Sequence, residues 1–330
     1  MPWNIIGHEW AVQMLQRDLA LGRSRQAYLF TGPAGVGKRT VVAELARALL
    51  CAAAEPPCDE CRHCRLVSHA NHPDLFTVAP EVSGKRVRAA KIKIEPMRQL
   101  IYSLTLKPVE AKRHVACLLN FDAANIETQN AFLKTLEEPP GQSVMLLTAE
   151  RAEDLLPTIV SRCEVVALRP LPLETVREAL ITRWLVPAAR AEWLAHLSGG
   201  RLGWAVRMQA DEAALEARTQ RLDELARLLQ ASRVERLAYA DQLAREGRLD
   251  RILDTLDLWV TFWRDVMLTS AGAAAPLANP DRETDIRRVA QTVSPALAGQ
   301  VMTALRRTGE LLEKNVNARL ALEVLLLDWP

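Results

Sequence analysis

The sequence predicts an α/β domain with a parallel sheet, followed by a region made only of helices. In the first half of the chain, short apolar runs alternate with segments whose apolar residues recur every three or four positions. Strands that alternate with helices in this way form parallel sheets covered on both faces. After about residue 169 no run has the pattern of a strand, and helical spacing continues to residue 330. A glycine-rich stretch between the first strand and the next helix is typical of a phosphate loop.

The composition is that of a soluble globular protein with two or three domains. The 330 residues are 49% hydrophobic and 25% charged, and a chain of this length can form more than one core. The formal net charge of +2 gives no overall case for nucleic-acid binding. The start, MPWNIIGHEW, lacks the pattern of a signal peptide, and no apolar run reaches the ~18 residues of a membrane span. We therefore expect a cytoplasmic protein with no membrane partner.

The elements of the α/β part follow from the periodicity and from the prolines. The prolines Pro139 and Pro140 end one helix, because a residue before proline avoids the helical conformation. Pro96 fits a helix only in its first turn. Strands are expected at 27–30, 75–78, 115–120, 144–148 and 164–168, and helices at 4–25, 41–50, 94–104 and 130–138.

The second half is predicted to be helical throughout. Pro170 and Pro172 indicate a hinge into a small helical domain that ends near residue 208, and the remainder forms a larger helical domain. Trp259 and Trp263 lie one helical turn apart, which suits a core or a subunit interface. Apolar residues at helical spacing are Ile252, Leu256, Trp259, Val260, Trp263 and Met267, and then Leu311, Leu312, Val316, Leu320 and Val324.

The glycine-rich stretch is GPAGVGKRT, which we interpret as a site for a nucleotide or phosphate. Its glycines let the backbone N–H groups point inward, and Lys38 places a positive charge near the terminal phosphates. The next position is normally Ser or Thr, whose hydroxyl binds Mg²⁺, but here it is Arg39. Thr40 is one position out of register for that role. The candidate phosphate-binding residues are Gly32, Gly35, Gly37, Lys38, Arg39 and Thr40.

Four of the six cysteines are close together in the sequence. Their gaps of six, two and two residues suit a tetrahedral Zn²⁺ site of structural type, although surface thiols or redox chemistry are alternatives. His63 and His69 are spare ligand types that the site does not need, and Cys117 and Cys163 are expected to be small core residues. The predicted zinc ligands are Cys51, Cys58, Cys61 and Cys64.

Three motifs give the chain a resemblance to a known family. They are NAFLKTLEEPP from Asn130, SRC at 161–163, and NVNARLALEVLLL from Asn315. In combination they resemble the subunits of the bacterial DNA polymerase III clamp loader, which are AAA+ proteins. The resemblance implies a RecA-like AAA+ domain at 1–168 with a zinc insert at 51–64. It also implies a small helical lid domain at 169–208 and a helical collar domain for oligomerisation at 209–330.

The resemblance also implies that the magnesium machinery has been lost. Alignment of the motif without gaps places Leu119 where the ATPase subunits have the Mg²⁺-binding Asp, and Asn120 where they have the catalytic Glu. The nearest acid, Asp122, falls past the end of the strand. Gly203 stands where the ATPase subunits have an Arg that senses their own nucleotide, and Arg201 could replace it only if its helix were rotated.

By the same resemblance, Arg162 of the SRC motif is an arginine finger that acts on the nucleotide of a neighbouring subunit. A solvated Arg at the entrance of a strand is the alternative. We therefore expect a stator that does not hydrolyse ATP, with gamma/tau ATPase and delta subunits, the sliding clamp and primed DNA as partners. ATP or phosphate could still bind the loop. A hydrolysing gamma/tau-type subunit is the second hypothesis, and a stand-alone DNA-binding motor is a more distant one.

A basic run without aromatic residues follows the second strand. Such a run could contact DNA phosphates, but charge runs usually mark solvated loops, which we favour here. Its residues are Lys85, Arg86, Arg88, Lys91 and Lys93.

Overall fold

The computed structural model describes residues 3–80, 91–246, 248–314 and 316–329, in two compact units. The first unit holds the chain up to residue 83 together with 89–179 and 200–204, and the second holds 180–199 and the chain from 205. Lys85, Arg86 and Arg88 of the basic run lie outside the described residues, as does Asn315. The division into three domains at 168 and 208 stays a prediction.

The first unit contains a five-stranded sheet in the order β2-β3-β4-β1-β5, in which every neighbouring pair is parallel. This confirms the predicted fold class, a RecA-like parallel sheet domain combined with an all-α part. The strand that leads into the phosphate loop lies between β4 and β5 and is buried throughout. The strands are β1 (Ala27–Thr31), β2 (Leu75–Val78), β3 (Val115–Leu118), β4 (Val144–Ala149) and β5 (Glu164–Ala167).

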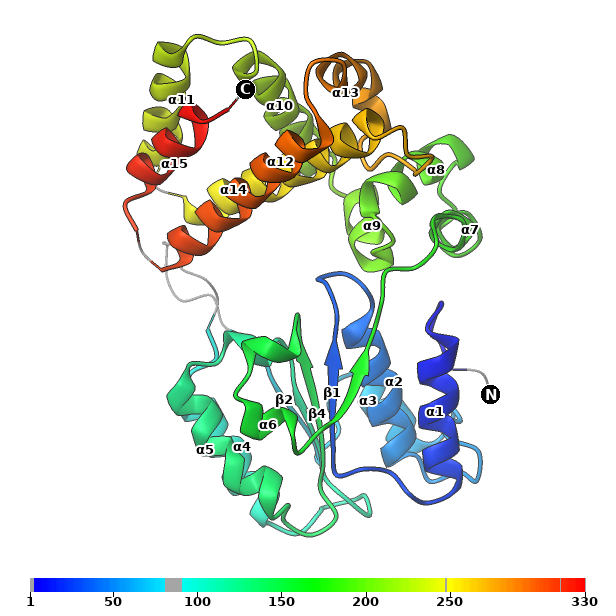
Figure 1. Ribbon diagram of the computed structural model, residues 1–330. Coiled ribbons are helices and arrows are strands. Elements are labelled where there is room, and N and C mark those ends of the chain that lie inside the picture. Colours follow the sequence, from blue (N-terminus) through cyan, green and yellow to red (C-terminus); the bar gives the residue numbers. More distant parts are fainter. Residues whose placement is uncertain (1–2, 81–90, 247, 315, 330) are drawn as a thin grey trace. The chain divides into compact units, whose positions relative to one another are not determined.

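Helices cover both faces of this sheet (Figure 1). Successive side chains of β1 alternate between the faces: Tyr28 and Phe30 pack with the helices on one side, and Leu29 packs on the other. This central parallel strand is therefore buried at every position, and all its residues except Thr31 are apolar. The first face is covered by α1 (Glu9–Ala20) and α2 (Lys38–Leu50), and the second by α4 (Ile94–Thr105) and α5 (Ile126–Glu137).

Three helices begin at residues other than those predicted, and one of them is α2, which was expected from residue 41 and begins at Lys38. The helix expected at 4–25 begins only at Glu9, because His8 has a positive φ of 59° and the chain turns there. Its exposed side includes Trp10, which is 52% exposed, while Leu15 is fully buried. The helix expected from residue 130 begins at Ile126, since the Asn125 side chain caps it by accepting from the Thr128 N–H at 2.8 Å.

Shorter elements complete the described chain up to residue 209. They are α3 (Arg62–Ser68), η1 (Phe121–Ala123), η2 (Ala152–Asp154), α6 (Pro157–Val160), α7 (Leu173–Trp184), α8 (Ala188–Ser198) and α9 (Leu202–Gln209). Among these, α3 begins within the Cys-rich insert at 51–64 and continues beyond it. Among the described helices, none combines the length and the apolar character needed to cross a membrane.

The helices from residue 212 onward pack around an aromatic core. Trp259 and Trp263 are both fully buried and contact Trp329 edge to face, with ring centroids 5.1 and 6.1 Å apart. Of the two predicted roles for these tryptophans, the core is the one found. These helices are α10 (Glu212–Leu228), α11 (Arg233–Arg245), α12 (Leu249–Ser270), η3 (Pro280–Arg282), α13 (Glu283–Ala290), α14 (Pro295–Glu313) and α15 (Ala318–Leu327).

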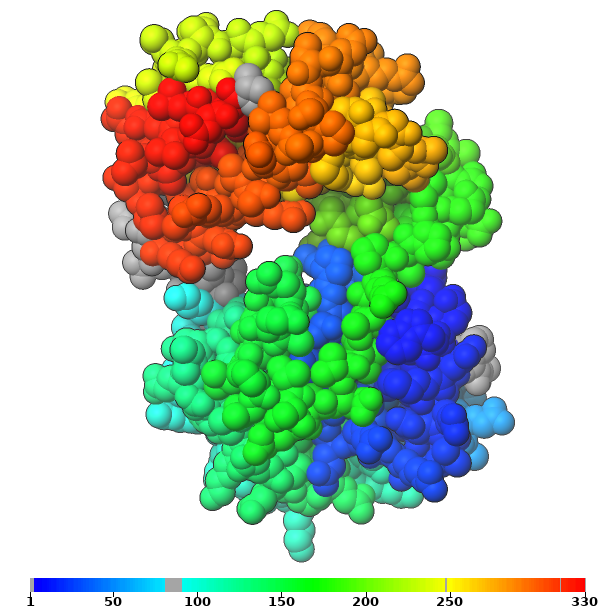
Figure 2. Space-filling model, viewed as in Figure 1, coloured from blue at the N-terminus to red at the C-terminus, as the bar shows by residue number. Residues whose placement is uncertain are grey.

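One apolar stripe at helical spacing near the C-terminus is exposed. Val316, Leu320 and Val324 are 41%, 57% and 55% exposed. The opposite side of α15, which includes Leu322 and Leu325, is buried in the core. Residues of α14 and α15, orange to red in Figure 2, form a continuous part of the visible surface of this unit. The helical spacing predicted from Leu311 to Val324 is divided between two helices, because α14 ends at Glu313 and α15 begins at Ala318, with Val316 between them. The exposed stripe is available to another surface.

Candidate functional sites

The phosphate loop has the backbone that its glycines predict. Gly32, Gly35 and Gly37 have φ values of 140°, 82° and 116°, a region that residues with a side chain rarely adopt. A Cβ on Gly32 would lie 2.3 Å from the carbonyl oxygen of Leu168. The Gly32 N–H donates to the Glu150 carbonyl at 3.0 Å, which attaches the loop to the end of β4. The loop is thus held in a curled form that leads directly into α2.

Lys38 lies inside this loop and is only 7% exposed. Its ammonium donates to the carbonyl oxygens of Gly32 and Pro33, the latter at 3.1 Å. Burial lowers the pKa of Lys38, while the nearby carboxylates of Glu150 and Asp122 act in the opposite direction. The predicted phosphate-binding lysine is therefore oriented into the loop.

Two residues that depart from the ATPase pattern, Arg39 and Asn120, contact each other. Arg39, at the start of α2, donates from Nη2 to Oδ1 of Asn120 at 3.3 Å. Asn120 follows β3 by two residues, and its own N–H donates to Oγ1 of Thr148 at 2.7 Å. The preceding Leu119 packs against the apolar cluster with α2. A guanidinium thus stands where the ATPase subunits were expected to place a hydroxyl, and an amide where they were expected to place the catalytic carboxylate. Thr40 is exposed on the first turn.

Two acids lie at this edge of the sheet, Asp122 and Glu150, and the second was not predicted from the sequence. Oδ2 of Asp122 accepts from the Glu150 N–H at 3.0 Å, and both carboxylates act on Lys38. Asp122 lies in η1, which begins directly after Asn120. The sequence had placed this acid past the end of the strand. Glu150 follows β4 directly, and β4 is the neighbour of β1. The carboxyl ends of parallel strands meet at one edge, so this position could have been found from the sequence.

Gly203 lies directly on the phosphate loop. Its N–H donates to the carbonyl oxygen of Gly35 at 2.8 Å, and a Cβ added to Gly203 would lie 3.0 Å from that oxygen. Arg201, which was considered as a replacement for the sensing Arg, stacks over the ring of Trp204 with its guanidinium carbon 5.6 Å from the ring centroid. This contact gives Arg201 a packing role.

Arg162 lies on the surface of the same unit, just after α6, with its side chain 33% exposed. Nη2 donates to Oε1 of Glu137 at 2.6 Å, and Nη1 donates to the carbonyl oxygen of Thr158 at 2.8 Å. Glu137 is the last residue of α5. This ion pair joins residues 25 positions apart, and no local pattern predicts it.

The four cysteines of the insert lie together, as predicted. All four sulfur atoms lie within 4.8 Å of one another. Sγ of Cys51 is 3.6 Å from that of Cys58 and 3.9 Å from that of Cys61, and the sulfurs of Cys58 and Cys64 are 4.0 Å apart. Tetrahedral Zn²⁺ with Zn–S bonds of about 2.3 Å requires sulfurs about 3.8 Å apart. The cluster could therefore bind a metal such as zinc, and within the described residues His63 and His69 are not part of it.

Backbone N–H groups stabilise the sulfurs of this cluster. The N–H groups of Ala53, Cys61 and Cys64 lie 3.4 Å from Sγ of Cys51, Cys58 and Cys61 respectively. Burial acts to raise the pKa of Cys61, but hydrogen bonds from the N–H groups of Cys64 and Ala52 outweigh it, and the pKa is lowered to about 6. Burial raises the pKa of Cys64 to about 12. A bound cation would favour the thiolate at every position.

The two remaining cysteines belong to the apolar interior, as predicted. Cys117 is 5% exposed and Cys163 packs against the cluster around α5. Burial raises the pKa of both thiols to about 12, so they are not reactive groups at neutral pH.

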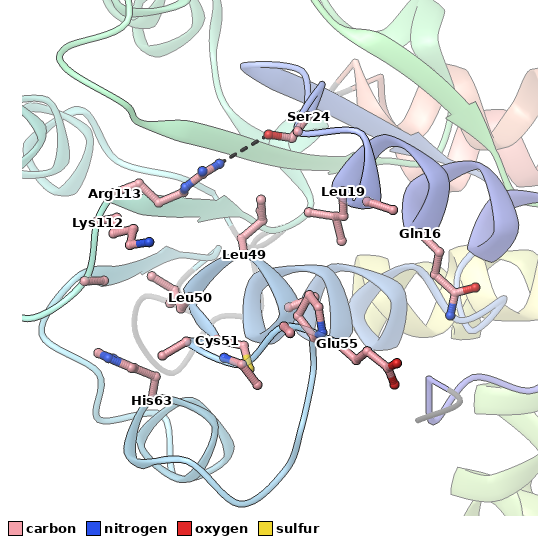
Figure 3. Close-up of a pocket in the computed structure, with 18 of the residues that line it drawn as sticks. Gln16, Leu19, Ser24, Leu49, Leu50, Cys51, Glu55, His63, Lys112 and Arg113 are labelled. Atoms are coloured by element: carbon pink, nitrogen blue, oxygen red, sulfur yellow. Dashed lines mark hydrogen bonds between the residues drawn. The ribbon is translucent and has the colours of Figure 1, made fainter.

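A cavity of about 680 Å³ lies beside the cluster of four cysteines. Figure 3 shows its apolar wall, with Leu19 from α1 and Leu49 from α2, and Arg113 on another side. Arg113 donates from Nη1 to Oγ of Ser24 at 3.2 Å, the dashed line in the figure. Cys51 of the cysteine cluster also lines the cavity. The sequence did not predict this cavity, because its walls come from three distant segments.

A histidine pair connects the metal centre to the sheet. The Asp74 N–H donates to Nδ1 of His72 at 3.0 Å, so in the neutral ring Nε2 of His72 carries the proton and donates to Nδ1 of His63 at 2.9 Å. Burial lowers the pKa of His72, which favours this neutral form. Since His63 lies between Cys61 and Cys64, this contact fixes the insert against the residues that lead into the start of β2.

Asp74 anchors the loop that follows α4. Its carboxylate is fully buried and accepts from the N–H groups of Val109, Glu110 and Ala111 at 2.6, 2.8 and 2.7 Å. Nε2 of His114 lies 3.6 Å from Oδ1. Burial acts to raise the pKa of Asp74, but these three donors and His114 outweigh it, and the pKa is lowered from 3.8. The carboxylate thus accepts the hydrogen bonds of three consecutive backbone N–H groups in this loop.

Asp74→Asn should therefore lower the free energy of unfolding at pH 7 by about 3 kcal/mol, because an amide presents an NH₂ group to buried donors. The pKa of Asp74 is depressed in the folded protein, so its stabilising contribution is complete above about pH 4 and is lost as the pH falls through the folded pKa. Denaturant unfolding of wild type and variant between pH 7 and pH 3 measures both effects.

The control is Asp154→Asn, which removes a surface ion pair with Arg151 and should cost less than about 1 kcal/mol. An Asp74→Asn variant as stable as the control at pH 7, or a difference from wild type that grows as the pH falls below 4, would contradict this account.

Two family profiles match the chain, and together they span most of it. Residues 7–172 match the family described as DNA polymerase III, delta subunit. Residues 212–330 match the family described as DNA polymerase III, delta subunit, C terminal. The first match contains the phosphate loop, the cysteine cluster and Arg162.

Individual relatives agree with these profiles. The chain is 33% identical to the DNA polymerase III subunit delta′ of Pseudomonas aeruginosa, and the match covers 93% of each chain. It is 26% identical to the subunit delta′ of Bacillus subtilis, over 96% of this chain and 94% of the relative. It is also 32% identical to the DNA polymerase III subunit tau of Salmonella typhimurium, but over only 54% of this chain and 27% of that relative.

Proposed function

This chain belongs to the DNA polymerase III delta subunit family, among the delta′ subunits of the clamp loader, and on that premise we propose that it is a stator that does not hydrolyse ATP. In this role it would form part of a ring with gamma/tau ATPase and delta subunits. It would present Arg162 to ATP bound by a neighbouring ATPase subunit and so assist the placing of the sliding clamp on primed DNA. A protein that acts in bacterial DNA replication would be located in the cytoplasm.

The observation that carries this proposal is the contact between Arg39 and Asn120. Phosphate-loop ATPases hold Mg²⁺ between a hydroxyl on the first turn of the helix and an acid at the end of a strand. Here the hydroxyl position holds a permanent cation, Arg39, and the expected position of the acid holds Leu119. Arg39 bonds to the amide of the next residue, Asn120, at 3.3 Å, where the catalytic Glu is expected. A guanidinium repels Mg²⁺ and cannot be deprotonated at neutral pH. The loop could still hold ATP or phosphate through Lys38 without magnesium-dependent hydrolysis.

The proposed arginine finger is supported by the position of Arg162. It follows α6 on the surface of the first unit, and its guanidinium is partly exposed to solvent. An arginine finger must reach a phosphate outside its own subunit, so a surface position is required.

We propose further that residues 169–208 form the lid, and that the chain from 209 to 330, which belongs to the second unit, forms the collar. The exposed stripe of Val316, Leu320 and Val324 supports a collar role, because apolar patches rimmed by polar residues mark protein interfaces. Zn²⁺ on the four cysteines would have a structural role, since no coordination position remains for water.

The test of the stator role is ATP turnover by the isolated chain. We expect no magnesium-dependent hydrolysis above background, measured as phosphate release with and without Mg²⁺. The matched control is Lys38→Ala, which should not change the measured rate. Magnesium-dependent turnover that Lys38→Ala abolishes would contradict the stator role and favour a hydrolysing gamma/tau-type subunit.

A further inference from the structure

We propose that Glu137 is the positioning residue for Arg162, so that it contributes to ATP hydrolysis in the neighbouring subunit without touching the nucleotide. This inference rests on the proposed function of Arg162 as an arginine finger. It begins from one contact: Oε1 of Glu137 accepts from Nη2 of Arg162 at 2.6 Å. A charge-assisted bond of this length is among the stronger ones available to a partly exposed side chain.

Helix stability does not explain Glu137. It is the last residue of α5, where the negative end of the helix dipole disfavours a carboxylate. It is exposed, so packing does not explain it either. Within the described part of the chain, Arg162 is its ion-pair partner. The neighbouring Glu138 is also exposed and makes no ion pair among the described residues, so it provides a natural comparison.

The guanidinium of Arg162 is held by two different helices. Nη2 is bound by Glu137 at the end of α5, and Nη1 by the carbonyl oxygen of Thr158 in α6. Two acceptors fix the plane of a guanidinium, which has five N–H donors in a rigid fork. The side chain remains 33% exposed, so donors remain for an incoming phosphate. Glu137 and the finger's nucleotide can therefore be bound at the same time.

The two helices that supply these acceptors are themselves fixed to each other. The buried Gln129 of α5 accepts from the Leu156 N–H at 2.9 Å, at the start of α6, and donates to the Ala124 carbonyl at 3.0 Å. Phe132 of α5 and Ile159 of α6 pack in the same apolar cluster. Glu137 thus extends from a rigid base. An arginine held in advance on such a base needs less ordering when it meets the phosphate, which favours the reaction.

The experiment is steady-state ATP hydrolysis by the clamp loader reconstituted with variants of this subunit. Glu137→Ala should lower kcat at the site that Arg162 serves by about fivefold with little change in KM for ATP, because orientation and not nucleotide binding is lost. Glu137→Gln keeps an acceptor oxygen at the same reach and should stay within about twofold of wild type. Glu137→Asp keeps the charge but is too short for the contact, and should resemble Glu137→Ala. Glu138→Ala is the matched control and should behave as wild type.

Two outcomes separate this inference from the proposed function. Suppose that Arg162→Ala lowers the rate of hydrolysis, while Glu137→Ala and Glu137→Asp leave it unchanged or raise it. The positioning role of Glu137 is then overturned, and the arginine-finger role of Arg162 stands. If Arg162→Ala has wild-type activity, the proposed finger fails and the positioning role with it. The double variant Arg162→Ala with Glu137→Ala should be no slower than Arg162→Ala alone; an additive loss would show a separate structural effect. Assembly of each complex is checked by size-exclusion chromatography.

Discussion

Arg162→Ala should nearly abolish ATP turnover at the site that this subunit serves in the reconstituted clamp loader. Arginine fingers stabilise the charge that develops on the transferred phosphoryl group, and they are worth about 10³-fold or more in kcat. The substitution removes a partly exposed surface side chain, so folding and ring assembly should be unchanged. The measurement is ATP hydrolysis by the complex with primed DNA and the clamp, together with the rate of clamp loading.

The side chains available near Arg162 allow a sharp comparison. Arg162→Lys keeps a positive charge but loses the planar fork, so it should restore only a small part of the rate. Arg151→Ala removes another exposed arginine of the same unit, one that pairs with Asp154, and should leave the rate unchanged. Because other ATPase sites in the ring can still turn over, the total rate falls by less than the rate at the served site. A complex with wild-type total hydrolysis and clamp loading would remove the finger role.

The strands and the phosphate loop could be predicted because their signals are local. An apolar run such as β2, from Leu75 to Val78, was placed with its correct ends, since polar residues and turns bound it on both sides. The loop followed from three glycines and Lys38, whose spacing reflects backbone geometry. The four cysteines came together because short gaps allow few arrangements other than a shared cluster.

The contacts on which the proposed function rests could not be predicted from local patterns. Arg39 and Asn120 are 81 positions apart, and Glu137 and Arg162 are 25 apart. Each contact depends on which strands are neighbours in the sheet and on which helices pack together. The sequence located Arg39 and Asn120 as departures from a motif, but only the fold shows that they bond to each other. Helix ends were also missed where one residue decides them, as His8 does for α1.

The metal centre shows why a cluster can be predicted while its importance needs the fold. The insert from Cys51 to Cys64 contributes few residues to the apolar core, Cys64 among them. Its other attachments are polar, such as the pair of His63 and His72 and the ion pair of Arg62 with Glu110 at 2.9 Å. Small modules without a core of their own depend on a metal or on disulfides. Among the described residues, all six cysteines are free thiols.

Removal of the metal, or Cys58→Ser, should therefore unfold the insert and lower the free energy of unfolding by roughly 5 kcal/mol. Purified wild type should contain one Zn per chain by native mass spectrometry, and the variant should contain less. The control is Cys163→Ser, which alters a thiol outside the cluster and should keep the zinc.

The geometry also indicates where the damage should spread. The insert is fixed to the start of β2 through His63, His72 and the N–H of Asp74. Loss of the metal should therefore loosen the insert and the start of β2 first. Limited proteolysis should then cut between Cys51 and Cys64 while the helical unit stays intact, because none of the residues in its apolar cluster comes from the insert. A freshly purified wild type without zinc, or a Cys58→Ser variant with wild-type zinc content and stability, would show that the four thiols have another role.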